Sequence, residues 1–365
     1  MLKRLYVDNF KAFVNFELRL DGHALLLGNN GSGKSTLIDT LLVLRRFLVD
    51  GDRVEDCVSH ETATRWESRL DQTIECELET SDGLLAYRLA LDPMGLVGEE
   101  SLSKNGNPLF KRRMGEVDVQ NQPSKIIVDS QRSVVPLFGA RRSTLGLAHL
   151  LEGFVETLER VLVLRPQPRG MSGRTEKETG YLDPSLSNFA SWWRLQWQEQ
   201  PAAMQDAIAS VGAVLPGFKG MSIQRRESDE YRVLKTRWET AADHNPTVEF
   251  AFDELSDGQR ILVAVHSIAN WLSSTGGGTL VLDEPDNYLA LAEIQPLIRS
   301  LLDTPGVQVV IASHHPEVLN DMAREYGLRL WRDKNGPVRV ERFVMPPDSG
   351  LTPAEHIAQR LDDNG

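Results

Sequence analysis

Residues 28–35 read Gly-Asn-Asn-Gly-Ser-Gly-Lys-Ser, a segment of the form G-x-x-x-x-G-K-[ST]. Glycines let the backbone curl so that successive N–H groups face one set of phosphate oxygens. Lys34 would then neutralise phosphate charge, and the Ser35 hydroxyl would ligate Mg²⁺. The predicted nucleotide-binding residues of this segment are Gly28, Asn29, Asn30, Gly31, Ser32, Gly33, Lys34, Ser35 and Thr36. The alternative is a glycine-rich turn that carries Lys-Ser by chance.

The elements around this segment decide between the two interpretations. Residues 24–27 form a short apolar run that predicts a buried strand, and residues 35–49 have apolar side chains at helical spacing. A strand before the glycines and a helix after them is the context that a phosphate-binding loop requires. We therefore expect the helix N-terminus to add a favourable dipole at the bound phosphates.

A second group of chemically capable residues follows the apolar run 279–282. The run ends in Asp283, Glu284 and Pro285. A buried strand that delivers an aspartate beside a phosphate loop is the usual way of holding Mg²⁺ in nucleotide hydrolases. Glu284 would then face the γ-phosphate and polarise a water as general base. An Asp-Glu-Pro turn without chemistry is the alternative.

Two further motifs lie close to these acids. Leu255-Ser256-Asp257-Gly258-Gln259 precedes a predicted helix, and the apolar strand 307–311 is followed by Ser313-His314-His315-Pro316. Considered singly, Ser256 is a good helix N-cap and a histidine at a strand end is usually structural. The order of the four motifs along the chain makes coincidence a poor explanation.

These motifs resemble those of the ABC-class ATPases: LSDGQ is similar to their signature and SHHP to their switch-histidine segment. The resemblance implies ATP and Mg²⁺ as cofactors, with Ser35 and Asp283 as metal ligands, and Glu284 and His314 as catalytic residues. It also implies a homodimer joined by ATP, in which Ser256, Gly258 and Gln259 of one protomer cap the γ-phosphate held by the other. Gln72 and Gln131 are candidates for the glutamine of this class, although a surface position is favoured for both.

The opening LYVDNFKAFVNFELRL is similar to that of the SMC, RecF and OLD ATPases, where Lys11 matches a basic turn residue that approaches the nucleotide. A solvated turn is the alternative for Lys11. The segments LSDGQR, LDEPDN and ASHHPEVLN look most like stand-alone OLD-like ATPases without a Toprim nuclease, since the stretch after Trp331 is too short for that domain. Related sequences read Leu-His-Pro where this chain has Tyr288–Leu291, so that histidine's role is absent.

Residues 2–9 and 16–20 predict strands, and 73–91 predicts a β-hairpin around Ser81-Asp82-Gly83. Residues 94–136 look poor in strands but are expected to continue an antiparallel sheet. Helical spacing covers 143–163 and 185–214, with a loop at 164–184. The fold expected is α/β, an ABC-type P-loop ATPase head with a mixed sheet, an antiparallel β-subdomain and a helical insertion. Its predicted parts are an N-terminal lobe (1–140), the helical insertion (141–220) and a C-terminal lobe (221–365).

Composition excludes several classes of protein. Of 365 residues, 41% are hydrophobic and 25% charged, which is ordinary for a globular protein. The longest apolar stretch, 261–272, is too short to span a membrane and no leader opens the chain, so no membrane partner is expected. Two cysteines indicate a reducing cytoplasm. The net charge of −12 argues against a surface that binds nucleic acid all over.

Several features carry weaker signals. The loop cations Arg165, Arg169, Arg174 and Lys177 could contact DNA phosphates, although a solvated loop is favoured. Two small groups of cations are expected to lie on the surface and to favour solubility: Lys111-Arg112-Arg113 and Arg141-Arg142. The indoles of Trp192, Trp193 and Trp197 indicate core packing rather than base stacking. No histidine or cysteine has metal-ligand spacing.

Two functions fit these motifs. The first is a regulatory or sensor ATPase of a prokaryotic phage-defence system that acts with a separate effector such as a nuclease. The alternative is a RecF- or SMC-like ATPase of DNA repair or chromosome maintenance that binds DNA directly. A transporter ATPase is disfavoured because the gap between Lys34 and Ser256 is long compared with transporter subunits.

Overall fold

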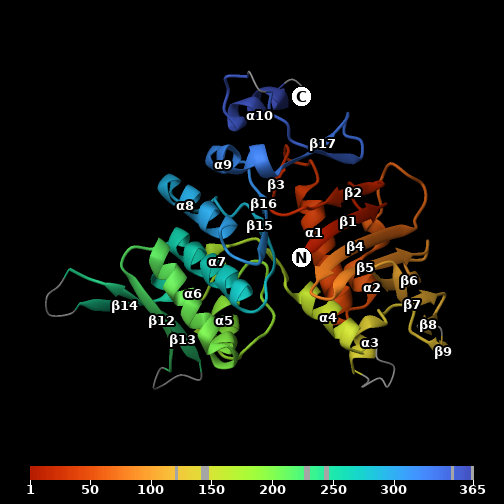
Figure 1. The fold of residues 1–365 in the computed structure, drawn as a ribbon, viewed down its shortest axis with the longest axis horizontal. Helices are drawn as coiled ribbons and strands as arrows, with labels where there is room; N and C mark the ends of the chain where they lie inside the picture. Colours follow the sequence, from red (N-terminus) through yellow and green to blue (C-terminus); the bar gives the residue numbers. More distant parts are fainter. Residues whose placement is uncertain (120–121, 141–147, 226–230, 242–245, 347–348, 363–365) are drawn as a thin grey trace. The chain divides into compact units, whose positions relative to one another are not determined.

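The computed structural model describes residues 1–119, 122–140, 148–225, 231–241, 246–346 and 349–362. Unit 1 consists of Met1–Val161, Ala323–Gly350 and Ile357–Gly365, and unit 2 of Leu162–Met322 and Leu351–His356. Figure 1 shows the elements of each unit. Among the described residues no helix is both long and apolar enough to cross a membrane.

Unit 1 contains an eight-stranded antiparallel sheet in the order β2-β1-β4-β5-β6-β7-β8-β9. Its strands are β1 (Leu2–Asp8), β2 (Phe16–Arg19), β4 (Gln72–Thr80), β5 (Gly83–Leu91), β6 (Val97–Lys104), β7 (Asn107–Arg113), β8 (Glu116–Val119) and β9 (Gln122–Ile127). The expected hairpin is confirmed as β4 and β5. Alternate residues of β4 are buried, as expected for a strand with one face on the core.

The expectation that residues 94–136 are poor in strands is wrong, since four strands lie there, although the expected continuation of the sheet is correct. Two of the connecting turns explain the error. Asn105-Gly106 and Met114-Gly115 each place two consecutive residues at positive φ. Such pairs match the right-handed twist of a hairpin. Met114 at φ 45° is an unusual residue for this geometry, so the composition of the segment does not predict a turn there.

A second strand group in unit 1 carries the phosphate-loop segment. Strand β3 (Ala24–Leu27) pairs in parallel with β17 (Gly327–Arg332), and β18 (Val338–Arg342) pairs antiparallel to β17. The helical segments of this unit are α1 (Lys34–Arg45), η1 (Arg46–Asp50), α2 (Val54–Cys57), η2 (His60–Thr62), α3 (Val135–Ala140), α4 (Ala148–Glu159) and α10 (Pro353–Asp362), whose first residues belong to unit 2. All four residues of β3 are buried, in agreement with the sequence.

A buried charged cluster fixes the far part of the large sheet. Arg112 on β7 is fully buried, so its assignment to a solubilising surface patch is wrong. Its guanidinium donates to the carbonyl oxygens of Arg132 and Asp129 at 2.6 and 2.7 Å and faces the Glu100 carboxylate at 3.4 Å. The second predicted patch, Arg141-Arg142, lies outside the described residues.

Unit 2 is built around the parallel strands β15 (Gly278–Asp283) and β16 (Val307–Ala312), with β10 (Val161–Leu164) next to β15. Its helical segments are η3 (Pro168–Gly170), α5 (Phe189–Glu199), α6 (Pro201–Val214), η4 (Phe252–Glu254), α7 (Asp257–Ser274), α8 (Leu291–Leu302) and α9 (Pro316–Tyr326), whose last residues belong to unit 1. A small sheet contains β11 (Arg174–Thr175), β13 (Arg232–Glu239), β12 (Phe218–Arg225) and β14 (Thr247–Ala251).

The core of unit 2 includes the predicted tryptophans. Trp192 and Trp193 are buried on α5, which confirms core packing for these two. The helix predicted over 185–214 is divided into α5 and α6, because Pro201 has no N–H to continue a helix and starts a new one. Asn270 on α7 donates to the Ser210 hydroxyl on α6 at 2.7 Å and joins these two helices.

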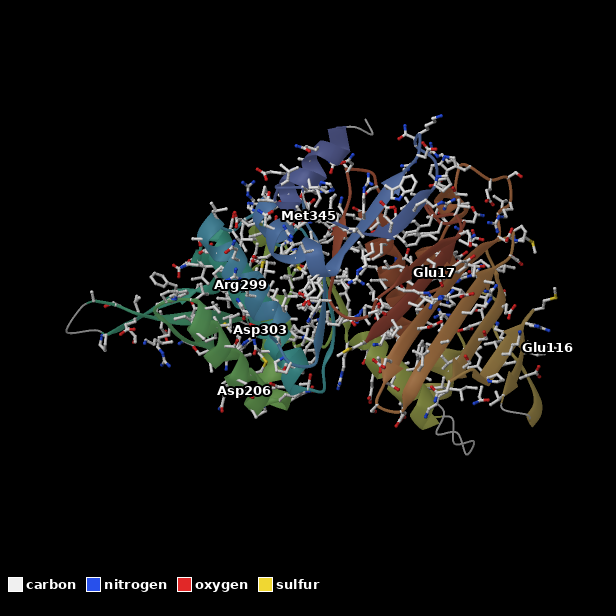
Figure 2. All side chains as sticks on the ribbon, turned by 45° about the horizontal axis from the view of Figure 1, so that its top comes forward. Glu17, Glu116, Asp206, Arg299, Asp303 and Met345 are labelled. Carbon is white, nitrogen blue, oxygen red and sulfur yellow. The ribbon has the colours of Figure 1, made fainter. Side chains whose placement is uncertain are left out.

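Acidic side chains lie on the outside of both units. Figure 2 labels Glu17 and Glu116 on strands of unit 1 and Asp206 and Asp303 at helices of unit 2, and all four are exposed. Cys57 and Cys76 are both free thiols. Burial raises the pKa of Cys76 to about 12, so this thiol stays protonated at neutral pH.

Candidate functional site

The phosphate-loop segment lies in unit 1 between β3 and α1, where the motif must lie. Gly33 is the N-cap residue of α1, so the free N–H groups of the first helical turn begin at Lys34. Asn29, Asn30, Gly31 and Ser35 are exposed, whereas Ser32 and Lys34 are buried. The exposed face of this loop therefore lies at a helix N-terminus, a geometry that suits phosphate binding.

Two glycines of the segment are required by close approach. A Cβ at Gly28, where φ is +149°, would stand 2.3 Å from the Leu330 carbonyl oxygen on β17. A Cβ at Gly33, where φ is +104°, would stand 2.8 Å from a Val338 methyl on β18. No side chain fits at those distances, so β17 and β18 pack directly on the loop backbone.

The Lys34 ammonium is hydrogen-bonded to the backbone of the phosphate loop. Its Nζ donates to the carbonyl oxygens of Gly28 at 2.5 Å and Asn29 at 3.3 Å. The side chain is only 7% exposed. Lys34 therefore adds positive charge at the N-terminus of α1, where the helix dipole already favours an anion.

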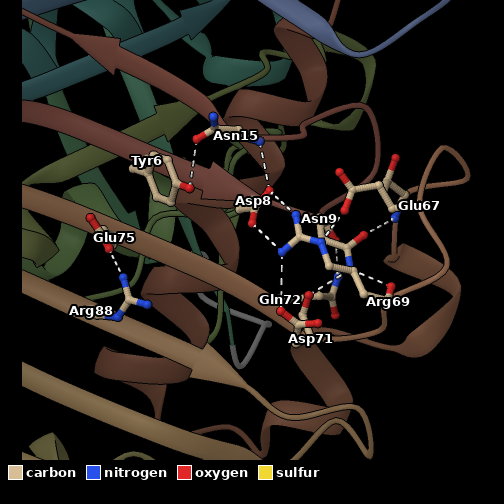
Figure 3. Close-up of polar contacts among 11 residues, drawn as sticks. Tyr6, Asp8, Asn9, Asn15, Glu67, Arg69, Asp71, Gln72, Glu75 and Arg88 are labelled. Atoms are coloured by element: carbon tan, nitrogen blue, oxygen red, sulfur yellow. Dashed lines mark hydrogen bonds and ion pairs between the residues drawn. The ribbon is translucent and has the colours of Figure 1, made fainter.

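Lys11 lies in unit 1 with the phosphate loop, but its ammonium contacts Asp39 of α1 at 2.7 Å. Its backbone is left-handed, with φ 49°, and its amide donates to the Thr62 carbonyl. The Lys11 turn is therefore fixed against residues 59–72. Figure 3 shows the polar cluster that holds this segment, in which the Arg69 guanidinium contacts the Asp8 carboxylate.

Gln72 is a buried member of the same polar cluster. Its amide donates to the Asn9 carbonyl at 2.9 Å, and it is only 4% exposed, so the expectation of a surface position for Gln72 is wrong. Asn9 is fully buried and donates to the carbonyl oxygens of Arg69 and Asp71. Gln131 is half-buried, and its side chain accepts from the Glu55 amide. Both glutamines have structural hydrogen bonds.

Two residues near the phosphate loop carry no motif. Arg332 on β17 donates to the Gly31 carbonyl at 3.2 Å, and its guanidinium lies 5.0 Å from the centre of the Trp66 ring. The Trp66 side chain is 41% exposed. An arginine and a tryptophan separated by most of the chain have no shared sequence pattern, so sequence reasoning could not associate them with the loop.

In unit 2 the parallel pairing of β15 with β16 brings the acids and the histidine segment to one edge. Asp283 is in register with Ala312, and the Glu284 amide donates to the Ala312 carbonyl at 2.8 Å. His314 follows two residues later and is exposed. The predicted metal ligand, base and switch histidine of this unit therefore lie at the carboxyl ends of adjacent strands, where ligands of such sheets bind.

Glu284 has a left-handed backbone, with φ 49°. A non-glycine residue in this region is uncommon and costs about 1–3 kcal/mol when the conformation is strained. Its carboxylate accepts a hydrogen bond from the Asn287 side-chain amide at 2.7 Å. The turn after β15 thus orients the predicted base.

Asp286 joins this turn to the histidine segment. It is only 5% exposed, and burial raises the pKa of its carboxyl while a hydrogen bond from the Ser313 hydroxyl opposes that rise. Ser313 also accepts from the His315 amide at 3.0 Å, and the His315 ring accepts from the Glu317 amide at 3.2 Å. His315 therefore helps to start α9, which leaves His314 as the exposed histidine of the pair.

The signature segment forms the N-terminus of α7. The Ser256 hydroxyl accepts from the Gln259 amide at 3.2 Å, and the Gln259 side chain accepts from the Ser256 amide at 3.1 Å. This capping box is the structural role that the sequence left open for Ser256. A Cβ at Gly258 would stand 3.0 Å from the Tyr288 carbonyl, so the signature turn lies against the segment that follows the acids.

Two arginines of unit 2 were not predicted for the site. Arg165, expected in a solvated loop, contacts the Asp283 carboxylate through its Nε at 2.9 Å. Arg260, directly after the signature, donates to the carbonyl oxygens of Leu255, Asp253 and Pro168. Arg174, another cation of the predicted loop, has its guanidinium 5.0 Å from the centre of the Tyr231 ring.

The predicted metal ligands fit Mg²⁺ by their chemistry. Ser35 offers a hydroxyl in unit 1 and Asp283 a carboxylate in unit 2, both oxygen donors of the kind that Mg²⁺ prefers. Asp283 already faces a cation, the Arg165 guanidinium. Within the described part of the chain no cluster of three or more His, Cys, Asp or Glu side chains is arranged to hold a metal.

Two family descriptions match parts of the chain. "P-loop containing region of AAA domain" matches residues 2–46, which include β1 to α1 and the phosphate loop. "AAA domain, putative AbiEii toxin, Type IV TA system" matches residues 212–320, which include the signature segment, the acids and the histidines. The two matches cover the two ends of the motif series found in the sequence.

Among curated proteins, the OLD nuclease of Thermus scotoductus is 24% identical over 381 aligned positions, which cover 95% of this chain. The chain spans 65% of that protein's length. Among solved structures, an SMC head bound to the C-terminal winged-helix domain of ScpA is similar in fold, with a TM-score of 0.59 at 14% identity. The alignment covers 94% of this chain and 98% of that one.

Proposed function

We propose that ATP hydrolysis drives a dimerisation switch in this chain, an ABC-like P-loop ATPase of the OLD and SMC type. In this proposal Lys34 and the N-terminal turn of α1 bind the phosphates. Ser35 and Asp283 would hold Mg²⁺, which would offset phosphate charge. The observation that carries the proposal is the edge of β15 and β16, where Asp283, Glu284 and His314 lie together.

The hydrolytic step is assigned to Glu284. Its carboxylate, oriented by Asn287, would accept a proton from the attacking water, and the exposed His314 would contact the γ-phosphate. The left-handed backbone at Glu284 is compatible with this role, because it belongs to the turn that places the carboxylate at the end of β15.

The dimer is assigned to the signature turn. The N-terminus of α7, with Ser256, Gly258 and Gln259, would cap the γ-phosphate held by a second copy of the chain. ATP would thus join two protomers across a two-fold axis, and hydrolysis would remove the shared contact. The fold similarity to an SMC head supports this arrangement.

A Glu284→Gln variant tests the switch. We expect it to bind ATP and to elute as a dimer with ATP and Mg²⁺, while hydrolysis falls by about 10²–10⁴-fold, the usual contribution of a general base. Lys34→Ala should lose both ATP binding and the dimer. Glu199→Gln, an exposed change on α5, is the matched control and should behave as the unchanged protein. Hydrolysis by Glu284→Gln at the unchanged rate would contradict the base assignment.

The output of the switch is proposed to be control of a separate effector, such as a nuclease, in a prokaryotic phage-defence system in the cytoplasm. The similarity to a protein named OLD nuclease supports it. The test is mass spectrometry of what co-elutes with the ATP-locked Glu284→Gln dimer expressed with its neighbouring genes. A stoichiometric nuclease or toxin-like protein is expected.

The second candidate is a DNA repair or chromosome-maintenance ATPase that binds DNA directly, which the fold similarity to an SMC head favours. It predicts ATP-dependent DNA affinity that falls steeply with salt, with a slope that counts the phosphates contacted. Recovery of nucleic acid alone with the locked dimer would place this candidate first.

A further inference from the structure

The Arg165 guanidinium contacts the Asp283 carboxylate, which is proposed to hold Mg²⁺. Its Nε lies 2.9 Å from Asp283 Oδ2, and the side chains are 31% and 17% exposed. A charge-assisted contact of this length in a half-buried place is stronger than a surface ion pair. Mg²⁺ and Arg165 therefore make use of the same carboxylate.

The position of Arg165 is fixed by its own backbone. It follows β10, and its amide donates to the Pro184 carbonyl at 2.6 Å. Pro166 comes directly after it and Pro168 two residues later, and both restrict the chain further. The backbone of Arg165 is thus held in place, and its guanidinium contacts Asp283 from a fixed position within unit 2.

The same segment is held by the signature helix. The Arg260 guanidinium donates to the Pro168 carbonyl at 2.6 Å, and it also donates to the carbonyl oxygens of Leu255 and Asp253 next to the signature. Residues 165–168 therefore connect the carboxylate at the end of β15 with the start of α7, entirely within unit 2.

We propose that Arg165 competes with Mg²⁺ for Asp283 and so sets the Mg²⁺ concentration at which the nucleotide is bound. In the metal-free protein the guanidinium neutralises the carboxylate, and Mg²⁺ must displace it. Arg165 is a positioning residue, since it acts through Asp283. This inference rests on the proposed function, because it takes Asp283 as the metal ligand.

The test is calorimetric binding of a non-hydrolysable ATP analogue to the full chain at graded Mg²⁺ concentrations, so that turnover plays no part. In Arg165→Ala we expect half-maximal binding at about tenfold less Mg²⁺, equivalent to about 1.4 kcal/mol. Binding measured without Mg²⁺ should not become tighter, because the Asp283 carboxylate then lacks its cation. Arg165→Gln, which keeps much of the length and removes the charge, should shift in the same direction.

Two further variants separate competition from a structural role. Arg165→Lys keeps a cation near Asp283 and should need nearly the unchanged Mg²⁺ concentration, whereas Arg169→Ala, an exposed change four residues on, should have no effect. If Arg165→Gln, folded by its thermal midpoint, needs as much Mg²⁺ as the unchanged chain or more, the proposal is wrong. If the unchanged chain binds no analogue, or Lys34→Ala binds it equally well, the proposed nucleotide site fails and this inference fails with it.

Discussion

The side-chain amide of Asn287 donates a hydrogen bond to the Glu284 carboxylate over 2.7 Å. Both residues belong to the turn that follows β15, and Glu284 enters this turn with a left-handed backbone. The turn thus fixes the carboxylate from two sides, through its own backbone and through a neighbouring amide. A base that is held in this way needs little reorganisation at the moment of proton transfer.

Asn287→Ala should therefore slow ATP hydrolysis about tenfold, because the carboxylate loses the donor that orients it. Asn287→Asp should slow it further, since a second negative charge would face Glu284. ATP binding should change little in either variant. Steady-state hydrolysis and equilibrium ATP binding check this, with the exposed Asn107→Ala as control. Unchanged hydrolysis in Asn287→Asp would show that this contact does not orient the base.

Gly28→Ala should destabilise unit 1 by about 2–4 kcal/mol, because a Cβ would combine an unfavourable backbone conformation with overpacking. The Cβ would stand 2.3 Å from the Leu330 carbonyl. Thermal unfolding measures the loss, and ATP binding should fall with it. Gly22→Ala is the control, since nothing lies within 4 Å of that Cβ and no loss is expected. Equal midpoints for the two variants would contradict the packing argument.

Arg112→Ala should cost about 3–5 kcal/mol of unfolding free energy, because it leaves the Glu100 carboxylate buried without its cation. Arg112 and Glu100 are both fully buried. Arg113→Ala, at the exposed neighbouring position, should change stability by no more than about 0.5 kcal/mol. Urea unfolding compares the two variants. A loss in Arg112→Ala as small as that in Arg113→Ala would mean that the cluster contributes little.

His266 should make the stability of unit 2 sensitive to acid. Burial lowers the pKa of this histidine from 6.5 to about 4. Between those values the unfolded chain binds more protons than the folded one, so stability is lost as the pH falls from about 6.5 toward 4. The loss by pH 5 should be about 2 kcal/mol relative to neutral pH.

Thermal midpoints at pH 7 and pH 5 check this prediction. The decrease should be smaller in His266→Leu, which cannot take up the proton. An equal acid-induced decrease in His266→Leu and in the unchanged protein would assign the effect to other groups.

The local elements and the motifs could be predicted from the sequence. Strand β3 and helix α7 lie where apolar spacing and Ser256 predicted them, because these signals depend on neighbouring residues only. The phosphate loop is likewise a local property, since its glycines, lysine and hydroxyl follow one another along the chain.

Tertiary structure decided which charged and polar side chains are buried and what they contact. Arg112 looked like one of three surface cations, yet it is buried because β7 faces inward at that position and Glu100 meets it from β6. Gln72 was expected at the surface and is buried beneath the Asn9 turn. Sequence patterns record the polarity of a residue but not the distant group that satisfies it.

The contact between Arg165 and Asp283 belongs to the same class. More than a hundred positions separate the two residues along the chain, and they meet because β10 lies next to β15 in the sheet. The order of strands in a sheet is set by packing over the whole unit, and no local spacing records it. The motifs in the sequence therefore predict the nucleotide chemistry, whereas the groups that orient Glu284 and contact Asp283 are defined only by the fold.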